Sequence, residues 1–254
     1  KYSFVAGCIT GKAIIESGEA VVEQRNKFST GDTIEVFAGE HEIPATAVLP
    51  EGATLKGAGK DQTTLKITTT NGDGLKLTNA NITISDMTVD GSNITSGGYK
   101  SLINVEADGC VVDNVVMVKG GRSTWNSSIL VEQIPATGTF TVKNSTISGS
   151  FRGVLRESCN AKIVIENCDI TAVYPFNIDG GSAGTVTVSD SKLHGWTSYS
   201  GIEKVTFTNC EFTKGSYDIV AAYVDTDFIG CTFDADFKIY AQTSGFTFTL
   251  KDCY

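Results

Sequence analysis

One short pattern recurs along most of the chain and limits what it can fold into. Its order is apolar, any, apolar, any, Asn or Asp, small or Cys, any, apolar. Clear copies read FTVKNSTI from Phe140, IVIENCDI from Ile163 and VTFTNCEF from Val205. Alternating apolar and polar positions are typical of a half-buried β-strand. Each copy is too short to bury its own apolar side, so neighbouring copies must stack on one another.

The Asn or Asp position of the pattern, which we call the anchor, marks each repeat. Side chains of this kind favour turns, where they hydrogen bond to local backbone and stack on their neighbours, so we interpret the anchors as structural. Successive anchors lie 19 to 30 residues apart, which predicts loops of variable length around a constant strand. The anchors are Gly57, Asp86, Asn114, Asn144, Asn167, Asp190, Asn209, Gly230 and Asp252.

A second strand is predicted between successive anchors, with copies such as INVE from Ile103, ILVE from Ile129 and FNID from Phe176. Two or three strands per coil predict an all-β chain, a right-handed parallel β-helix of about nine coils over residues 31–254. Residues 1–30 lack the pattern and are expected to cap the first coil. The last repeat carries no polar cap, which favours a chain truncated at its C-terminus.

The segments GDTIEVFAGEHEI from Gly31 and ATLKGAGKDQTTLKI from Ala53, followed by the Asn-Cys repeats, resemble the pectin-lyase-like superfamily. The resemblance covers residues 31–254. It implies a right-handed parallel β-helix, and an exported bacterial protein that is secreted or held at the cell surface. That superfamily includes polysaccharide lyases, polygalacturonases, pectin esterases and many exported bacterial surface proteins of unknown activity, so the fold alone does not select a function.

Charge and cysteine content exclude several classes. The net charge of −9 argues against nucleic acid as a partner, and no apolar run is long enough to span a membrane. Four of the seven cysteines directly follow an anchor, which predicts a buried row of free thiols. Disulfides between successive coils are possible at strand spacing but would strain the geometry, and without a Cys-x-x-Cys pair neither a zinc nor a redox site is predicted. These four are Cys168, Cys210, Cys231 and Cys253.

A charged row is predicted on the outer face of the second strand. Counting from the next anchor aligns Glu132, Arg156 and Asp179 on successive coils, with Glu106 before them. The alternative register turns Arg156 inward, where an unpaired guanidinium is expensive. If the protein is an enzyme, these three residues are the predicted catalytic group, because lyases of this fold use a basic residue and hydrolases use paired carboxylates.

A ligand-binding group is predicted from aromatic and polar residues assigned to loops or to the outer face. Exposed aromatic rings provide platforms for sugar faces. Asn177, Asp179 and His194 also resemble parts of polygalacturonase motifs, but the adjacent aspartate pair and the Arg-x-Lys motif are absent, so that chemistry is not assigned. The predicted ligand-binding residues are Arg122, Trp125, Asn177, His194, Trp196 and Tyr199.

Three functions remain open at this stage. The first is a monomeric, non-catalytic protein that binds poly- or oligosaccharides, and the second is a lyase or hydrolase acting on an acidic polysaccharide. The third is a structural stalk. No metal site or cofactor is predicted, although the pairs Asp225 with Asp227 and Asp234 with Asp236 could hold a calcium ion.

Overall fold

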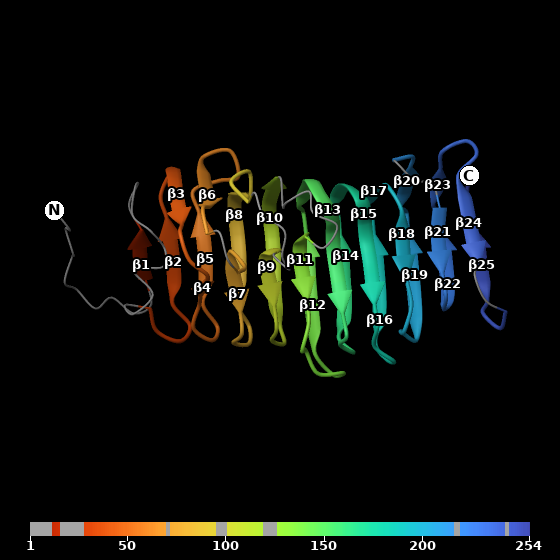
Figure 1. The fold of residues 1–254 in the computed structure, drawn as a ribbon, viewed down its shortest axis with the longest axis horizontal. Helices are drawn as coiled ribbons and strands as arrows, with labels where there is room; N and C mark the ends of the chain where they lie inside the picture. Colours follow the sequence, from red (N-terminus) through yellow and green to blue (C-terminus); the bar gives the residue numbers. More distant parts are fainter. Residues whose placement is uncertain are drawn as a thin grey trace.

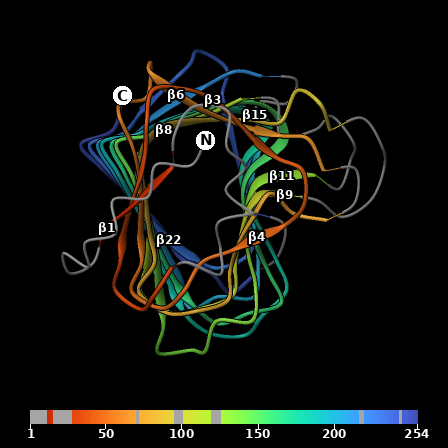
Figure 2. The same ribbon diagram turned by 90° about the vertical axis from the view of Figure 1, so that its left-hand side faces the viewer.

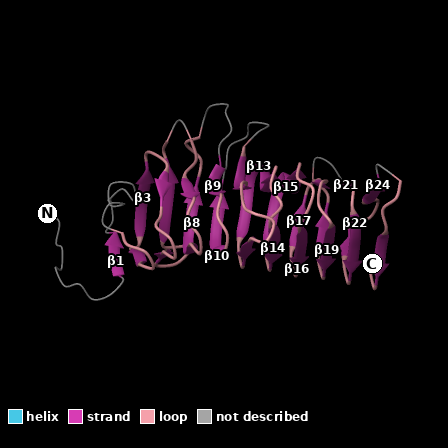
Figure 3. Cartoon of the chain, turned by 90° about the horizontal axis from the view of Figure 1, so that it is seen from below, coloured by secondary structure: helices cyan, strands magenta, loops and turns pink. Residues whose placement is uncertain are grey.

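The chain forms an elongated solenoid whose strands lie side by side along its long axis (Figure 1). The computed structural model describes residues 12–15, 28–69, 72–94, 101–118, 126–215, 219–241 and 244–254. Within these residues all regular structure is β-strand, with no helix (Figure 3). Viewed from its end, successive coils superimpose as turns around one axis (Figure 2).

Every coil contributes parallel strands to three columns, in which each strand pairs with its counterpart one coil earlier. Three strands per coil agree with the prediction of two or three, and long strands such as β13 turn from the second column into the third. The first column comprises β1 (Lys12–Ile15), β2 (Thr33–Val36), β5 (Thr54–Gly57), β8 (Thr83–Asp90), β10 (Cys110–Val118), β12 (Thr139–Lys143), β14 (Lys162–Glu166), β16 (Thr185–Ser189), β19 (Lys204–Thr208), β22 (Asp225–Ile229) and β25 (Phe248–Lys251).

The second and third columns follow the same order. The second column comprises β3 (Gly39–Ile43), β6 (Thr63–Ile67), the ends of β8 and β10, the starts of β13 (Thr146–Glu157) and β15 (Asp169–Asp179), β17 (Lys192–His194), β20 (Glu211–Thr213) and β23 (Thr232–Phe233). The third column comprises β4 (Ala47–Val48), β7 (Leu75–Leu77), β9 (Ser101–Val105), β11 (Ser127–Val131), the ends of β13 and β15, β18 (Thr197–Tyr199), β21 (Ile219–Ala222) and β24 (Lys238–Ala241). The parallel β-helix is therefore confirmed, with a coil number close to the nine predicted.

The anchors occupy the turn between the first and second columns, as their side chains predict. All of them except Gly57 have a positive φ, between 49° and 64°, a region that Asn, Asp and Gly adopt most readily. Their side chains also bond from coil to coil. Asn167 Nδ2 donates to Asn144 Oδ1 at 2.9 Å, and Asn209 Nδ2 donates to Asp190 Oδ1 at 3.1 Å.

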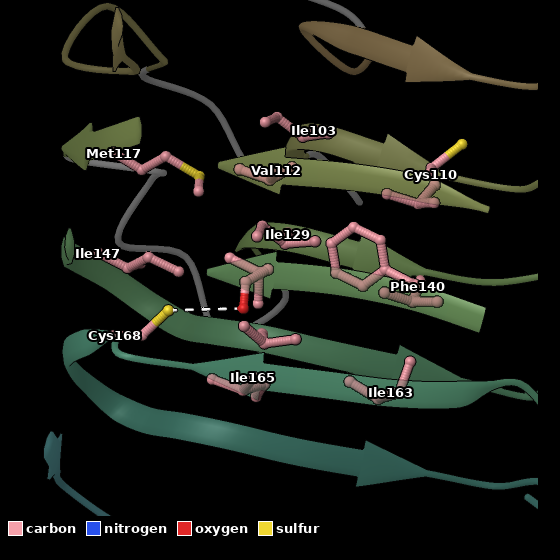
Figure 4. Packing of buried hydrophobic residues seen from close by; sticks show 14 of the residues in the cluster. Ile103, Cys110, Val112, Met117, Ile129, Phe140, Ile147, Ile163, Ile165 and Cys168 are labelled. Carbon is pink, nitrogen blue, oxygen red and sulfur yellow. Dashed lines mark hydrogen bonds between the residues drawn. The ribbon is translucent and has the colours of Figure 1, made fainter. Parts of the chain in front are cut away.

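The interior of the solenoid is a continuous apolar core (Figure 4). Residues from successive coils stack at equivalent positions, and Phe207 and Phe228 lie with ring centroids 5.2 Å apart. The row after the anchors is buried as predicted, apart from partly exposed Cys253. Its thiols donate to backbone carbonyls, and the dashed line in Figure 4 joins Cys168 Sγ to the Val142 oxygen at 3.7 Å.

The predicted N-terminal cap lies largely outside the described residues. Of residues 1–30, the structure describes 12–15 and 28–30. The strand β1 pairs with β2 in parallel register, so the first column begins one strand before residue 31. The described part of the chain has no long apolar helix of the kind that crosses a bilayer.

The anchor turn gives a direct stability prediction. Asn167→Ala should lower the free energy of unfolding by about 1–2 kcal/mol, because alanine tolerates a φ of 49° poorly and loses the bond to Asn144. Asn167→Gly keeps the backbone freedom and should cost less. Denaturant unfolding measures both variants, and equal losses would contradict a backbone origin.

Candidate functional site

The outer face of the third column carries the predicted site. Along each of its strands, side chains alternate between the core and the outside, so inward and outward residues form separate rows across the coils. One inward row contains Val105, Val131 and Ile178, all buried. The neighbouring row, which points away from the core, contains Lys76, Asn104, Leu130, Leu155, Asn177 and Ser198. Within it Asn104, Leu130, Leu155 and Asn177 are buried, and Lys76 and Ser198 are partly exposed.

The predicted placement of Arg156 between Glu132 and Asp179 is wrong by one residue. Arg156 pairs with Val131 on one side and Ile178 on the other, and its side chain is 0% exposed. It therefore belongs to an inward row. The residue paired with Asp179 is Glu157.

Backbone carbonyls at the turn from the third to the first column explain why Arg156 can point inward. Its Nε donates to the Cys159 oxygen at 2.7 Å, and its Nη2 donates to the same oxygen and to that of Ala183 at 2.8 Å. These bonds offset part of the cost of burying the charge. Burial lowers the pKa of Arg156. Its guanidinium does not reach the outer face, so the lyase arrangement that required it there has no geometric basis.

Without Arg156, the outward row at the end of the third column is entirely acidic across four coils. We call it the acid row, and it consists of Glu106, Glu132, Glu157 and Asp179. Neighbouring like charges at strand spacing repel by about 1 kcal/mol in water, and by more when partly desolvated. The acid row therefore gathers four acidic side chains on the outer face, of which Glu106 pairs with Lys76.

A polar cluster lies at the first two positions of the acid row. Asn104, which is 2% exposed, donates through Nδ2 to Asp73 Oδ2 and Glu132 Oε1, each at 2.9 Å, and to Glu106 Oε1 at 3.4 Å. Lys76 Nζ lies 2.7 Å from Glu106 Oε1. The sequence analysis did not identify Asp73 or Asn104. For Asn104 a signal was present, because it lies between two apolar residues in INVE and should therefore point away from the core.

The surroundings of the polar cluster raise the pKa of Glu132. Partial burial raises its pKa, and contact with Glu106 raises it further, whereas the hydrogen bond from Asn104 lowers it. Two carboxyl groups that share a site cannot both ionise cheaply. Among the described residues, no group of three or more His, Cys, Asp or Glu side chains is arranged to hold a metal ion.

At the opposite edge of the third column, three half-buried aromatic rings follow one another on successive coils. We call Phe151, Tyr174 and Trp196 the aromatic series. Phe151 and Tyr174 have ring centroids 5.2 Å apart, and Tyr174 stacks on Trp196 at 5.0 Å. The guanidinium of Arg152 lies 5.6 Å and 5.8 Å from the centroids of Phe151 and Tyr174. The aromatic series was predicted only at Trp196.

The polar neighbours of the aromatic series include two of the predicted residues. Asn177 is 8% exposed, and its Oδ1 accepts from Arg152 Nε at 3.0 Å while its Nδ2 donates to the Ser198 oxygen at 3.2 Å. His194 is half-buried in β17, with Nδ1 2.7 Å from Thr213 Oγ1.

Other predicted residues lie elsewhere. Tyr199 was expected in a loop, but it belongs to β18 and is 0% exposed, because it occupies an inward position where its ring packs near Phe176 and Phe207. Arg122 and Trp125 lie outside the described residues.

The two aspartate pairs proposed for calcium contact protein groups. Asp225 Oδ1 accepts from the Thr247 amide at 2.8 Å, and Asp227 Oδ2 lies 2.6 Å from Lys204 Nζ. Asp234 Oδ2 accepts from the Lys214 amide at 2.6 Å, and Asp236 has a positive φ of 65°.

Comparison with solved structures finds the same fold in several other proteins. The A-module of mannuronan C-5 epimerase AlgE4 from Azotobacter vinelandii matches with a TM-score of 0.54 at 13% identity, over 84% of this chain and 71% of the module. The PL6 family alginate lyase AlyGC matches with a TM-score of 0.55 at 12% identity, over 94% of this chain and 40% of the lyase. Escherichia coli YbhC matches with a TM-score of 0.54 at 11% identity, over 100% of this chain and 87% of YbhC.

The chain shares a parallel β-helix fold with these structures. These identities support the fold, not a shared activity. No protein-family model matches the chain, and no curated protein matches it in sequence. The function of the candidate site must therefore be inferred from the geometry of this chain's own residues.

The raised pKa of Glu132 predicts a pH effect. Because the pKa of Glu132 is higher in the folded chain than in the unfolded chain, protonation of Glu132 adds to the free energy of unfolding. This added stability is fully present below the pKa of the unfolded chain and is lost as the pH rises through the pKa of the folded chain. Glu132→Gln imitates the protonated form, so its melting temperature relative to the unaltered chain should increase between about pH 4 and about pH 7.

The exposed Glu203 supplies the control, since Glu203→Gln should leave the pH dependence unchanged. Thermal unfolding followed by circular dichroism gives the comparison. A constant offset between Glu132→Gln and the unaltered chain across this range would contradict the expected linkage.

Proposed function

We propose that this protein binds a poly- or oligosaccharide along the outer face of the third column without cleaving it. The observation that carries the proposal is the aromatic series, in which Tyr174 and Trp196 stack 5.0 Å apart on successive coils. The faces that Tyr174 and Trp196 share are covered by the stacking, so these half-buried rings offer a sugar their free edges and outer faces as apolar surface. A repeat of one ring per coil suits a ligand that repeats along the solenoid axis.

Polar groups beside the aromatic series would orient the ligand. Arg152 packs against Phe151 and Tyr174 and is tied to Asn177, so its guanidinium helps to fix the rings. His194 lies on the strand that leads to Trp196 and offers a further hydrogen-bonding group. Arg122 and Trp125 remain proposed contacts from the sequence alone.

The charge of the outer face favours an uncharged glycan over an acidic one. The acid row places carboxylates on four successive coils, and the chain as a whole carries a net charge of −9. A polyanion lying across both edges of the third column would have its charges near this row and be repelled. For the alternative enzyme, we therefore propose an uncharged glycan as the substrate in place of the acidic polysaccharide predicted from the sequence.

A second candidate is a glycoside hydrolase acting through the polar cluster. Asn104 Nδ2 contacts carboxylate oxygens of both Glu106 and Glu132, which brings these two groups to the same site. A carboxyl group with a raised pKa beside a second carboxyl group that pairs with Lys76 is an arrangement suited to acid and base catalysis. The structural stalk remains a third reading.

We further propose that the protein acts outside the bacterial cell, secreted or at the cell surface, as a monomer. Its support is the resemblance to exported β-helix proteins. Calcium at the aspartate pairs stays a prediction from the sequence.

A binding test distinguishes the candidates. A glycan array selects a ligand, and calorimetry then compares Trp196→Ala and Tyr174→Ala with the unaltered chain. Loss of one stacking ring should weaken binding by roughly three- to tenfold. Tyr254→Ala is the matched control, because Tyr254 is 86% exposed after β25 and its backbone bonds to Cys231 and Phe233, away from the third column.

The same glycans are assayed for new reducing ends. Binding that depends on Trp196, without release of product, supports the binding protein. Product that disappears in Glu132→Gln would instead establish the hydrolase. Binding that neither aromatic substitution weakens would contradict a role for the aromatic series.

A further inference from the structure

Three cysteine side chains are stacked in one inward row at the C-terminal coils. Cys210, Cys231 and Cys253 each follow an anchor, and their strands stay in register, with Glu211 paired to Thr232 and Ile229 paired to Lys251. Adjacent strands lie about 4.8 Å apart, which falls within the range of Cα separations that a disulfide can bridge. Neighbouring thiols of this row are therefore placed at bonding distance by the coil itself.

The thiols of this row also contact one another. Hydrogen bonding between Cys210 and Cys231 lowers the pKa of Cys231 to about 7 and, together with burial, raises the pKa of Cys210. Contact with Cys253 also favours the thiolate of Cys231. A thiolate is the nucleophilic form of cysteine, so Cys231 has the character of an attacking group.

Exposure differs along the row. Cys210 and Cys231 are buried, whereas Cys253 is partly exposed and gives a reagent its point of entry.

Cys168 lies in the same row but differs in one respect. Its neighbours there are Ser145 and Ser191, and the Ser191 hydroxyl accepts from the Cys168 amide at 3.0 Å. Cys168 thus has no sulfur neighbour in its own row with which to form a disulfide.

We propose that Cys253 and Cys231 form a dithiol site that takes low-molecular-weight disulfides as its substrate and closes into an intrachain disulfide between successive coils. Cys253 attacks the reagent disulfide, forms a mixed disulfide and releases one small thiol. The Cys231 thiolate then attacks Cys253 Sγ and releases the second small thiol. The two protein thiols lose two electrons and two protons, and the reagent disulfide gains them.

This inference departs from the expectation that the absence of Cys-x-x-Cys excludes redox chemistry. That rule applies to thiols brought together within one turn of chain. Here the solenoid brings together residues 22 positions apart, so the pair is visible only once the register is known. The site is also independent of the carbohydrate proposal, because it lies in the core rather than on the outer face.

Peptide mapping tests the proposal on the folded chain. The protein is incubated with oxidised glutathione at neutral pH, its remaining thiols are alkylated, and tryptic peptides are analysed by mass spectrometry. Cleavage after Lys214, Lys238 and Lys251 separates the three cysteines of the row. We expect the peptide of residues 215–238 to be linked to that of residues 252–254, with two hydrogens lost and Cys168 still reduced.

Two variants make the order of steps testable. Cys231→Ser should lose the link and leave Cys253 as its glutathione mixed disulfide, whereas Cys210→Ser should keep the link. Circular dichroism before and after oxidation shows that both variants remain folded. A mixed disulfide at Cys253 as the end product in the unaltered chain would overturn the proposal. So would modification of Cys168 at the same rate, since that would report unfolding.

Discussion

The parallel hydrogen-bond ladder between successive coils determines most of what this protein presents to its surroundings. Because each strand pairs in register with the strand one coil away, residues at the same position of successive coils lie side by side. Where the sequence repeats a residue type at one position, it forms a row: anchors at the turn, thiols in the core, and carboxyl groups at one edge of the third column. Stacking of the coils thus turns the weak preference of a side chain for one position into a row that extends along the solenoid.

The same constraint makes the structure sensitive to a shift of one residue, which exchanges the inner and outer faces of a strand. The strand β13 has an irregular register between Ser148 and Ser150, where its pairing with β15 skips Gly149, whose φ is 75°. Downstream of that point, Val154 and Arg156 face the core and Glu157 faces outward. Arg156 is held there by the turn carbonyls of Cys159 and Ala183.

Much of the architecture was predictable because it depends on local preference repeated many times. The alternation of apolar residues, the turn-forming anchors and the row of small residues after them all follow from single side chains, and the structure confirms each. The placement of Arg156 was not predictable in this way. Its nearest anchor lies 11 residues away, but the outward residues Glu132, Glu157 and Asp179 lie 12, 10 and 11 residues before theirs, so the intervening turn differs between coils.

Only part of the candidate site could be predicted, because the turns between its residues differ from coil to coil. Trp196 and Asn177 lie together as neighbours of Arg152 and Tyr174, whereas Tyr199 was assigned outside although its strand turns it inward. Asn104 and Asp73 meet only through the pairing of β7 with β9, which no local pattern indicates. Contacts between residues on coils of unequal length could therefore be identified only from the structure.

Site-directed labelling tests the register of β13 most directly, and with it the uninterrupted acid row. Arg156→Cys and Glu157→Cys are each treated with a charged maleimide under native conditions, and labelling beyond that of the unaltered chain is measured. The described register predicts that the cysteine at position 157 reacts and the cysteine at position 156 is protected. Fast labelling at position 156 with protection at position 157 would contradict it, and would return Arg156 to the outer face between Glu132 and Asp179.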